Sequence, residues 1–163
     1  NEEPPFFKTE NMGSEHFAAS FKEKGRPVEL MLSLETMGYY TAKPKTQQYP
    51  FPFELLFTDR GVFLGLVSNI ASRAKFERFG AKLQSDQRII TNGMALPTFI
   101  PGVDWSDHWS FWERGYDAVM VTDTALFRYP YYHTLQDTPD KIDFDTLTGV
   151  VLAVEQGVLD LAR

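Results

Sequence analysis

The chain has 163 residues, 43% of them hydrophobic and 23% charged, which is enough to bury the core of one globular domain. Its formal net charge of −6 argues against nucleic acid or an anionic membrane as a partner, because both carry negative charge. Its lack of cysteine excludes disulfides, thiol nucleophiles and thiolate metal sites, and no apolar run reaches the roughly 18 residues of a membrane helix.

The first third of the chain predicts one helix, one strand and one long loop. Residues 14–25 have helical character, with Ser14 as the expected N-cap and Gly25 as the C-terminal stop. Residues 27–35 are apolar and extended, which favours a strand. Residues 41–60 contain three prolines and show no steady period, so we expect an ordered loop. Loops of this length are uncommon unless they are functional.

The rest of the chain alternates strands with helices. Residues 61–69 and 117–124 are continuous apolar runs, typical of strands that are covered on both faces. Residues 68–80 predict a helix that stops at its final glycine. Residues 143–163 predict a helix with one buried apolar face, made of Leu147, Val151, Val154, Val158 and Leu161. This alternation predicts an α/β layered fold in a single domain covering residues 1–163.

Acidic residues and one histidine stand where the expected strands end. Glu2 and Glu3 would end a strand that runs in from before residue 1, and Glu35 ends the run of residues 27–35. Asp123 ends the later apolar run, and His133 follows it by ten residues. In open α/β sheets, functional sites gather at the carboxyl ends of the strands, so we expect a site here.

The adjacent glutamates Glu2 and Glu3 are suited to metal chemistry. Their Cα atoms lie about 3.8 Å apart, so the two carboxylates repel unless one is protonated or a cation binds. One glutamate can then hold the metal while its neighbour takes a proton from the activated water. Zinc accepts carboxylate oxygen and histidine nitrogen, which makes Glu3, Glu35 and His133 a sensible ligand set. The competing interpretations are a solvated terminus, a surface salt bridge at Glu35 and a loop histidine held by a backbone carbonyl.

Six motifs occur in the order seen in family-28 zinc metallopeptidases, which this chain resembles from its first residue to about Leu147. They are "NEEPPFF", "MGSEHFA", "MLSLETMGYY", "QQYP", "GVDWSDHWSFWERGYDAVMVTDTALFR" and "YYHTLQDTPDKIDFDTL". The Glu-Glu pair alone would be a weak signal, whereas the ordered set is specific.

The resemblance implies a role for each candidate residue. It implies Glu2 as general base, and Glu3 and His133 as zinc ligands. Glu35 falls where the family usually has an aspartate ligand, and its longer side chain departs from the pattern by one methylene. Asp107 and His108 match a family "SDH" motif, beside the ligands or in the substrate pocket. For Asp107, capping of the helix that follows is the competing interpretation.

The resemblance also implies a fold and an activity. The fold is zinc-exopeptidase-like, with a three-layer mixed sheet flanked by helices. The activity is that of an aminopeptidase with two zinc ions, which hydrolyses the N-terminal bond of a peptide substrate through a metal-activated water. In the family a histidine and a bridging aspartate ligand precede the Glu-Glu pair. We therefore expect this chain to be the C-terminal portion of the catalytic domain, incomplete at its N-terminus and inactive alone.

The sequence leaves two alternative functions open, and it raises expectations about the oligomeric state and the compartment. A glutaminyl cyclase-type acyltransferase uses a similar fold with one zinc, and assays of Gln-peptide cyclisation against Leu-anilide hydrolysis would separate it. A metal-free, protease-like binding domain would lack a ligand at the bridging-aspartate position. An incomplete sheet would leave an exposed edge, through which we expect a homo-oligomer. The resemblance favours a secreted or periplasmic bacterial protein, but the sequence itself does not fix the compartment.

Overall fold

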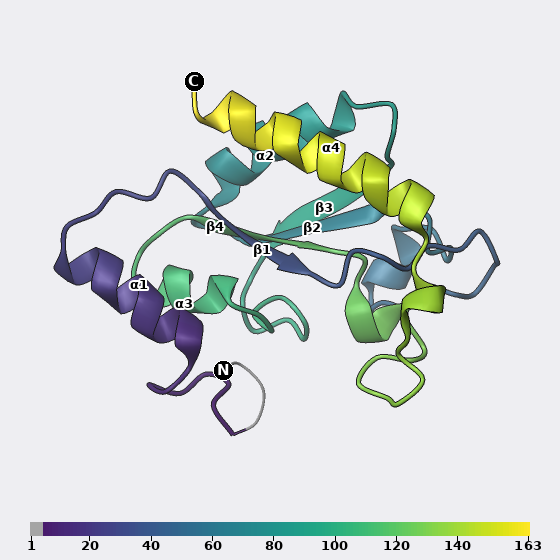
Figure 1. The fold of residues 1–163 in the computed structure, drawn as a ribbon, viewed down its shortest axis with the longest axis horizontal. Coiled ribbons are helices and arrows are strands. Elements are labelled where there is room, and N and C mark those ends of the chain that lie inside the picture. The colour runs from purple at the N-terminus through teal and green to yellow at the C-terminus, as the bar shows by residue number, and fades with distance from the viewer. Residues whose placement is uncertain (1–4) are drawn as a thin grey trace. The chain divides into compact units, whose positions relative to one another are not determined.

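The computed structural model describes residues 5–163 and contains a four-stranded mixed sheet together with helices (Figure 1). The strand order is β1-β4-β2-β3. The strands are β1 (Met31–Glu35), β2 (Leu64–Asn69), β3 (Thr91–Leu96) and β4 (Ala118–Thr122). The helices are α1 (Gly13–Glu23), α2 (Arg73–Gln84), α3 (His108–Glu113) and α4 (Phe144–Leu161), with 3-10 turns at Phe53–Leu55, Ala125–Phe127 and Pro139–Lys141. The predicted α/β class is confirmed.

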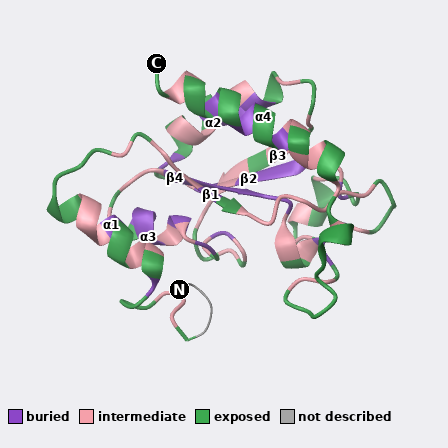
Figure 2. Cartoon of the chain, in the orientation of Figure 1, coloured by how far each residue is buried: buried purple, intermediate pink, exposed green. Residues whose placement is uncertain are grey.

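Strands β1, β2 and β4 follow the predicted apolar runs, and the exposure of each strand follows its place in the sheet. The central strand β4 is buried at every residue, and β2 is buried at four of its six positions (Figure 2). The edge strand β1 has one buried residue, Ser33. At β1, Met31 N–H donates to Asp117 O, and Asp123 N–H donates to Thr36 O, so β1 and β4 are parallel.

The sequence did not predict β3. Its residues "TNGMAL" include asparagine and glycine, which are depleted in strands, and the strand lies at the edge of the sheet with no fully buried residue. Pairing in the sheet, rather than local propensity, makes this segment a strand.

The chain divides into two compact units. The first unit contains residues 1–33, 67–78 and 94–120, and the second contains residues 34–66, 79–93 and 121–163. In the first unit, α1 packs against α3. Its core is formed by Ala18, Val103, Phe111, Trp112 and Ala118. The expectation of a single domain stays a prediction.

The helix boundaries correct two predictions in the first two helices. Ser14 is not an N-cap: α1 begins at Gly13, and Ser14 Oγ instead lies 2.9 Å from Ser110 Oγ, within hydrogen-bond distance. Gly25 has φ of +59° just beyond the helix, as its stop signal predicts. Gly80 does not end α2, which continues to Gln84 because the good helix formers that follow bring Leu83 into full burial.

The buried face of α4 is also different from the predicted one. Val151 and Val158 are 54% and 45% exposed. The buried positions are Val150, Ala153, Val154 and Gly157, which also recur at helical spacing. The face with the smaller residues packs inward because Gly157 lets the helix approach Phe79 and Leu83 of the second unit closely. The predicted N-terminus is confirmed, since Asp143 accepts a hydrogen bond from Thr146 N–H.

Two further expectations concern the long loop and the membrane. Residues 41–60 form a loop with one 3-10 turn, as predicted, and Thr41 makes an isolated antiparallel bridge to Gly61 just beyond it. Within residues 5–163 no helix combines the length and apolar character that a membrane span requires. The expected homo-oligomer stays a prediction.

We predict that Gly157→Ala destabilises the protein despite the higher helix propensity of alanine. A Cβ at this position would lie 2.6 Å from Phe79 Cε2 and 2.7 Å from Leu83 Cδ1. The propensity gain is about 1 kcal/mol, whereas forced overpacking costs about 1–3 kcal/mol. Urea unfolding should show a net loss, and the exposed neighbour Gln156→Ala should change stability by less than about 0.5 kcal/mol. A more stable Gly157→Ala variant would contradict this packing.

Candidate active site

Glu35 is the last residue of β1 and the first candidate ligand that the structure describes. It is partly exposed, and the chain turns sharply after it, because Thr36 has φ of +38°. A threonine in the left-handed region is strained and persists only where its surroundings fix it. The turn places the Glu35 carboxylate at the carboxyl end of a strand, where the sequence predicts a site.

His133 lies on the loop that follows β4, in the same unit as Glu35. Its backbone has φ of +56°, a second left-handed non-glycine residue. Its ring stacks on Tyr132, with the ring centroids 3.9 Å apart and the planes 16° apart. The His133 side chain is exposed.

A buried carboxylate joins the loops that leave β1 and β4. Asp123 is 1% exposed; its Oδ2 accepts a hydrogen bond from Tyr39 N–H at 2.8 Å and its Oδ1 accepts one from Ala125 N–H at 3.1 Å. Burial raises the pKa of this carboxyl, and the two backbone donors act in the opposite direction. Asp123 therefore does more than cap a local turn, because Tyr39 and Ala125 are far apart in the sequence.

Backbone strain concentrates next to Asp123. Thr124 and Ala125 have φ of +77° and +45°, and both come directly after the Asp123 clamp. Thr122 Oγ1 accepts a hydrogen bond from Thr124 N–H at 2.8 Å, which fixes the turn from the other side. Strained residues of this kind cost about 1–3 kcal/mol each and cluster at functional sites, which makes this corner a candidate.

Arg128 is a second buried charge in the same unit, and the sequence reasoning missed it. Its Nε donates to Gln47 Oε1 at 2.7 Å, and its guanidinium lies 4.5 Å from the Phe63 ring centroid. The aliphatic part of the side chain fits against Gly61, where a Cβ would come within 2.7 Å of Arg128 Cδ. The only signal in the sequence was a lone cation in the apolar run "ALFRYP".

The predicted "SDH" motif lies in the first unit. Asp107 occupies the N-cap position of α3, but its side chain makes no capping hydrogen bond, so the competing interpretation receives no support. Ser106 Oγ lies 2.9 Å from Ser33 Oγ, and both residues are buried. His108 is fully buried, with Nε2 2.7 Å from Val103 O and its ring edge-on to Trp112.

His108 is a neutral core histidine in this arrangement. Burial lowers its pKa to about 4, well below the ordinary value for imidazole. Val103 O can only accept, so Nε2 carries the proton, and Nδ1 is buried without a hydrogen-bond partner among residues 5–163. The roles expected for Asp107 and His108 beside the ligands or in the substrate pocket stay predictions.

Of the predicted metal ligands, Glu35 and His133 lie among the described residues. Glu2 and Glu3 lie outside the described residues. Within residues 5–163 no group of three or more His, Cys, Asp or Glu side chains could hold a metal ion. Glu35 and His133 have the oxygen and nitrogen donors that zinc accepts, but the described residues alone do not complete a ligand set.

The comparisons with known proteins identify the family. The model of peptidase family M28 matches residues 6–157. The chain belongs to this family. Over 152 residues it is 41% identical to the uncharacterized protein YfbL of Escherichia coli K12, covering 93% of this chain and 46% of that protein. It is also 28% identical to the probable leucine aminopeptidase 1 of Trichophyton verrucosum, covering 93% of this chain and 36% of the relative.

Solved structures of M28-like aminopeptidases share the fold. The LapA aminopeptidase of Legionella pneumophila matches with a TM-score of 0.68 at 18% identity, covering 93% of this chain and 35% of LapA. The aminopeptidase from Aneurinibacillus sp. strain AM-1 matches with a TM-score of 0.57 at 23% identity, covering 90% and 29%. The recognition from sequence motifs is confirmed, and this M28 chain spans less than half the length of the relatives it matches.

We predict that Asp123→Asn strongly destabilises this M28 chain. The amide would present an N–H donor to one of two backbone N–H groups, leaving buried donors face to face. An unsatisfied buried polar group costs about 1–3 kcal/mol. Urea unfolding monitored by circular dichroism measures this loss. The exposed substitution Glu54→Gln makes the same carboxyl-to-amide change and should be nearly neutral; equal effects of the two would refute the clamp.

We also predict a pH dependence of stability that comes from His108. The pKa of His108 is lowered to about 4 in the folded state, against about 6.5 in the unfolded chain. The unfolded state therefore binds the extra proton, and stability falls as the pH drops from about 6.5 to about 4. The loss is at most roughly 3 kcal/mol.

The variant His108→Gln removes this titration, so its stability should vary less over this pH range than that of the wild type. Because the readout is the slope with pH, a general destabilisation by the substitution does not affect it. The exposed histidine variant His16→Gln should keep the wild-type slope. An unchanged slope in His108→Gln would show that His108 is not buried in neutral form.

Proposed function

We propose that the protein to which this chain belongs is a zinc-dependent aminopeptidase. Membership of peptidase family M28 and relatives described as leucine aminopeptidases support hydrolysis of the N-terminal bond of a peptide. They also favour substrates with an apolar N-terminal side chain. Hydrolysis is favoured over cyclisation because the named relatives are peptidases.

The observation that carries the proposal is the placement of the two described candidate ligands. Glu35 ends β1, and His133 lies on the loop that leaves β4; β1 and β4 are parallel neighbours in the sheet. The carboxyl ends of adjacent parallel strands are where α/β enzymes build their sites. The strained, clamped corner at Asp123 belongs to the same unit and holds both loops.

The proposed ligands follow from this placement and from the sequence motifs. Glu3 and His133 would hold one zinc ion and Glu35 the other, with further ligands outside this chain. Zinc, when bound, supplies a Lewis acid for the scissile carbonyl and lowers the pKa of water. Glu35 reaches further than an aspartate would, and the partly exposed strand end can accommodate the additional methylene.

Glu2 is proposed as the general base. Its carboxylate takes a proton from the attacking water and delivers it to the leaving amine, a role that requires a group within hydrogen-bond reach of both. On this proposal this chain alone is inactive, since the donors it contributes are fewer than two metal ions require.

We predict that Glu2→Gln in the full-length protein lowers kcat for leucine-anilide hydrolysis by about 10²–10⁴-fold, because the amide cannot accept the proton. Zinc content should stay at the wild-type level, since Glu2 is not a ligand. The nearby exposed substitution Glu10→Gln is the matched control and should leave kcat unchanged. Near-normal turnover in Glu2→Gln would reject the base assignment, and cyclisation of a Gln-peptide by the wild type without hydrolysis would reject the aminopeptidase.

A further inference from the structure

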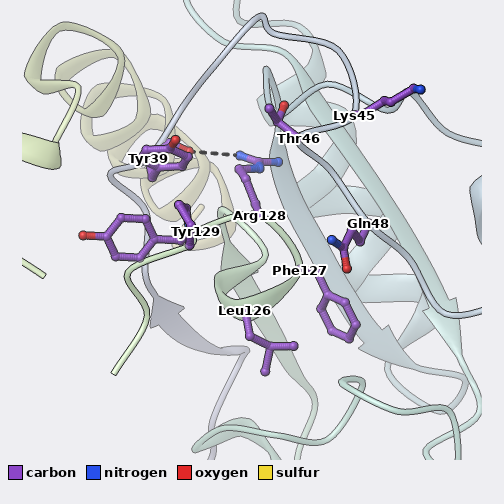
Figure 3. A pocket seen from close by; sticks show the side chains of 9 residues that line it. Tyr39, Lys45, Thr46, Gln48, Leu126, Phe127, Arg128 and Tyr129 are labelled. Atoms are coloured by element: carbon purple, nitrogen blue, oxygen red, sulfur yellow. Dashed lines mark hydrogen bonds between the residues drawn. The ribbon is translucent and has the colours of Figure 1, made fainter. Parts of the chain in front are cut away.

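A pocket of about 260 Å³ opens in the second unit (Figure 3). Its walls come from residues 39–48, which follow β1, and from residues 126–130, which follow β4. The volume is slightly below the range of about 300–1,000 Å³ that is usual for drug-sized ligands, so it suits a molecule of amino-acid size.

The described residues that line this pocket carry positive charge, whereas the chain as a whole is acidic. Of the nine lining residues, two are cationic, Arg128 and Lys45, and none is acidic. The chain as a whole carries 22 acidic against 16 basic residues. Among residues 5–163 the charged side chains that line the pocket are all cationic, which favours an anion as its ligand.

The Arg128 side chain is held rigidly at this pocket. Its Nη1 donates to Tyr39 O at 3.4 Å, the bond drawn in Figure 3, and its Nε donates to Gln47 Oε1. The rings of Phe63 and Tyr40 lie 4.5 and 5.6 Å from the guanidinium carbon. A guanidinium fixed in this way loses little further entropy when it binds a ligand.

No carboxylate among residues 5–163 forms a direct ion pair with Arg128. The side chain is 5% exposed. Its Nη2 is buried and has no hydrogen-bond partner in the same part of the chain. Burial lowers the pKa of Arg128, and the charge of Asp123 acts in the opposite direction without a direct bond to the guanidinium.

We propose that this pocket binds the carboxylate of a small apolar acid, such as an amino acid or the C-terminus of a short peptide. Arg128 lines the pocket wall, so a carboxylate bound there can pair with its guanidinium, which has no direct ion-pair partner among residues 5–163. The proposal does not rest on the peptidase function, because it uses none of the candidate metal ligands.

The remaining walls favour a carboxylate over a phosphate. Leu126, Phe127 and Tyr129 offer apolar surface for a ligand side chain beside the acid group. Phosphate sites generally collect several backbone N–H groups in glycine-rich loops or at helix N-termini, and no glycine is among the described residues that line this pocket. Lys45 is exposed and extends outward in Figure 3, so it adds long-range attraction rather than a fixed contact.

The test compares a matched acid and amide by isothermal titration calorimetry on the wild-type chain, with a chelator present to exclude metal-mediated binding. N-acetyl-L-leucine should bind at least about tenfold more tightly than N-acetyl-L-leucinamide, because bonds to a charged acceptor are lost in the amide. Equal affinities, or no binding of the acid, would overturn the proposal. Inorganic phosphate binding more tightly than the acid would overturn the assignment to carboxylates.

Three variants and one control locate the binding. Gln48→Trp changes an exposed wall residue, fills the pocket and should abolish binding without disturbing Arg128. Arg128→Lys should weaken binding about tenfold or more if circular dichroism shows that it folds. Lys45→Gln should weaken binding only about twofold, and Lys43→Gln, a cation of the same loop outside the pocket, should not change it. Unchanged binding in Gln48→Trp would place the site elsewhere and reject the proposal.

Discussion

The buried carboxylate of Asp123 is the constraint on which the candidate active site depends. Two backbone N–H groups from separate loops bind its two oxygens, and it is withdrawn almost completely from water. A buried charge is tolerated only when such bonds compensate the lost hydration, so the loops and the carboxylate stabilise each other. The left-handed residues around it keep their conformations because this clamp fixes both ends.

The lost hydration of the buried charges on Asp123 and Arg128 is compensated in different ways. Asp123 is satisfied by backbone donors, whereas Arg128 relies on neutral oxygen acceptors and aromatic faces. Their opposite charges still attract, since Asp123 counters the lowering of the pKa of Arg128 by burial. Within residues 5–163 they form no direct ion pair, and Nη2 of the guanidinium has no hydrogen-bond partner. A direct pair would have neutralised the pocket and removed its capacity to bind an anion.

The fold was predictable where local signals and burial agree. Two apolar runs became the central strands β2 and β4, and the Asp143 cap set the start of α4. Predictions failed where packing opposed local preference. β3 is built from poor strand formers, and the close approach of Gly157 to its neighbours turned α4 so that large valines face outward. Periodicity gives the spacing of a helical face, but the shape of the neighbouring surface decides which face is buried.

The sequence by itself determined the family, the α/β class and the placement of Glu35 and His133 after strands, because ordered motifs and apolar runs are local features of the chain. Only the tertiary structure decided what Asp123, His108 and Arg128 do. Each is a polar side chain whose role depends on burial and on partners distant in the sequence. Burial and hydrogen bonds to distant partners arise only when the chain folds, because the side chains lose their hydration as these bonds form.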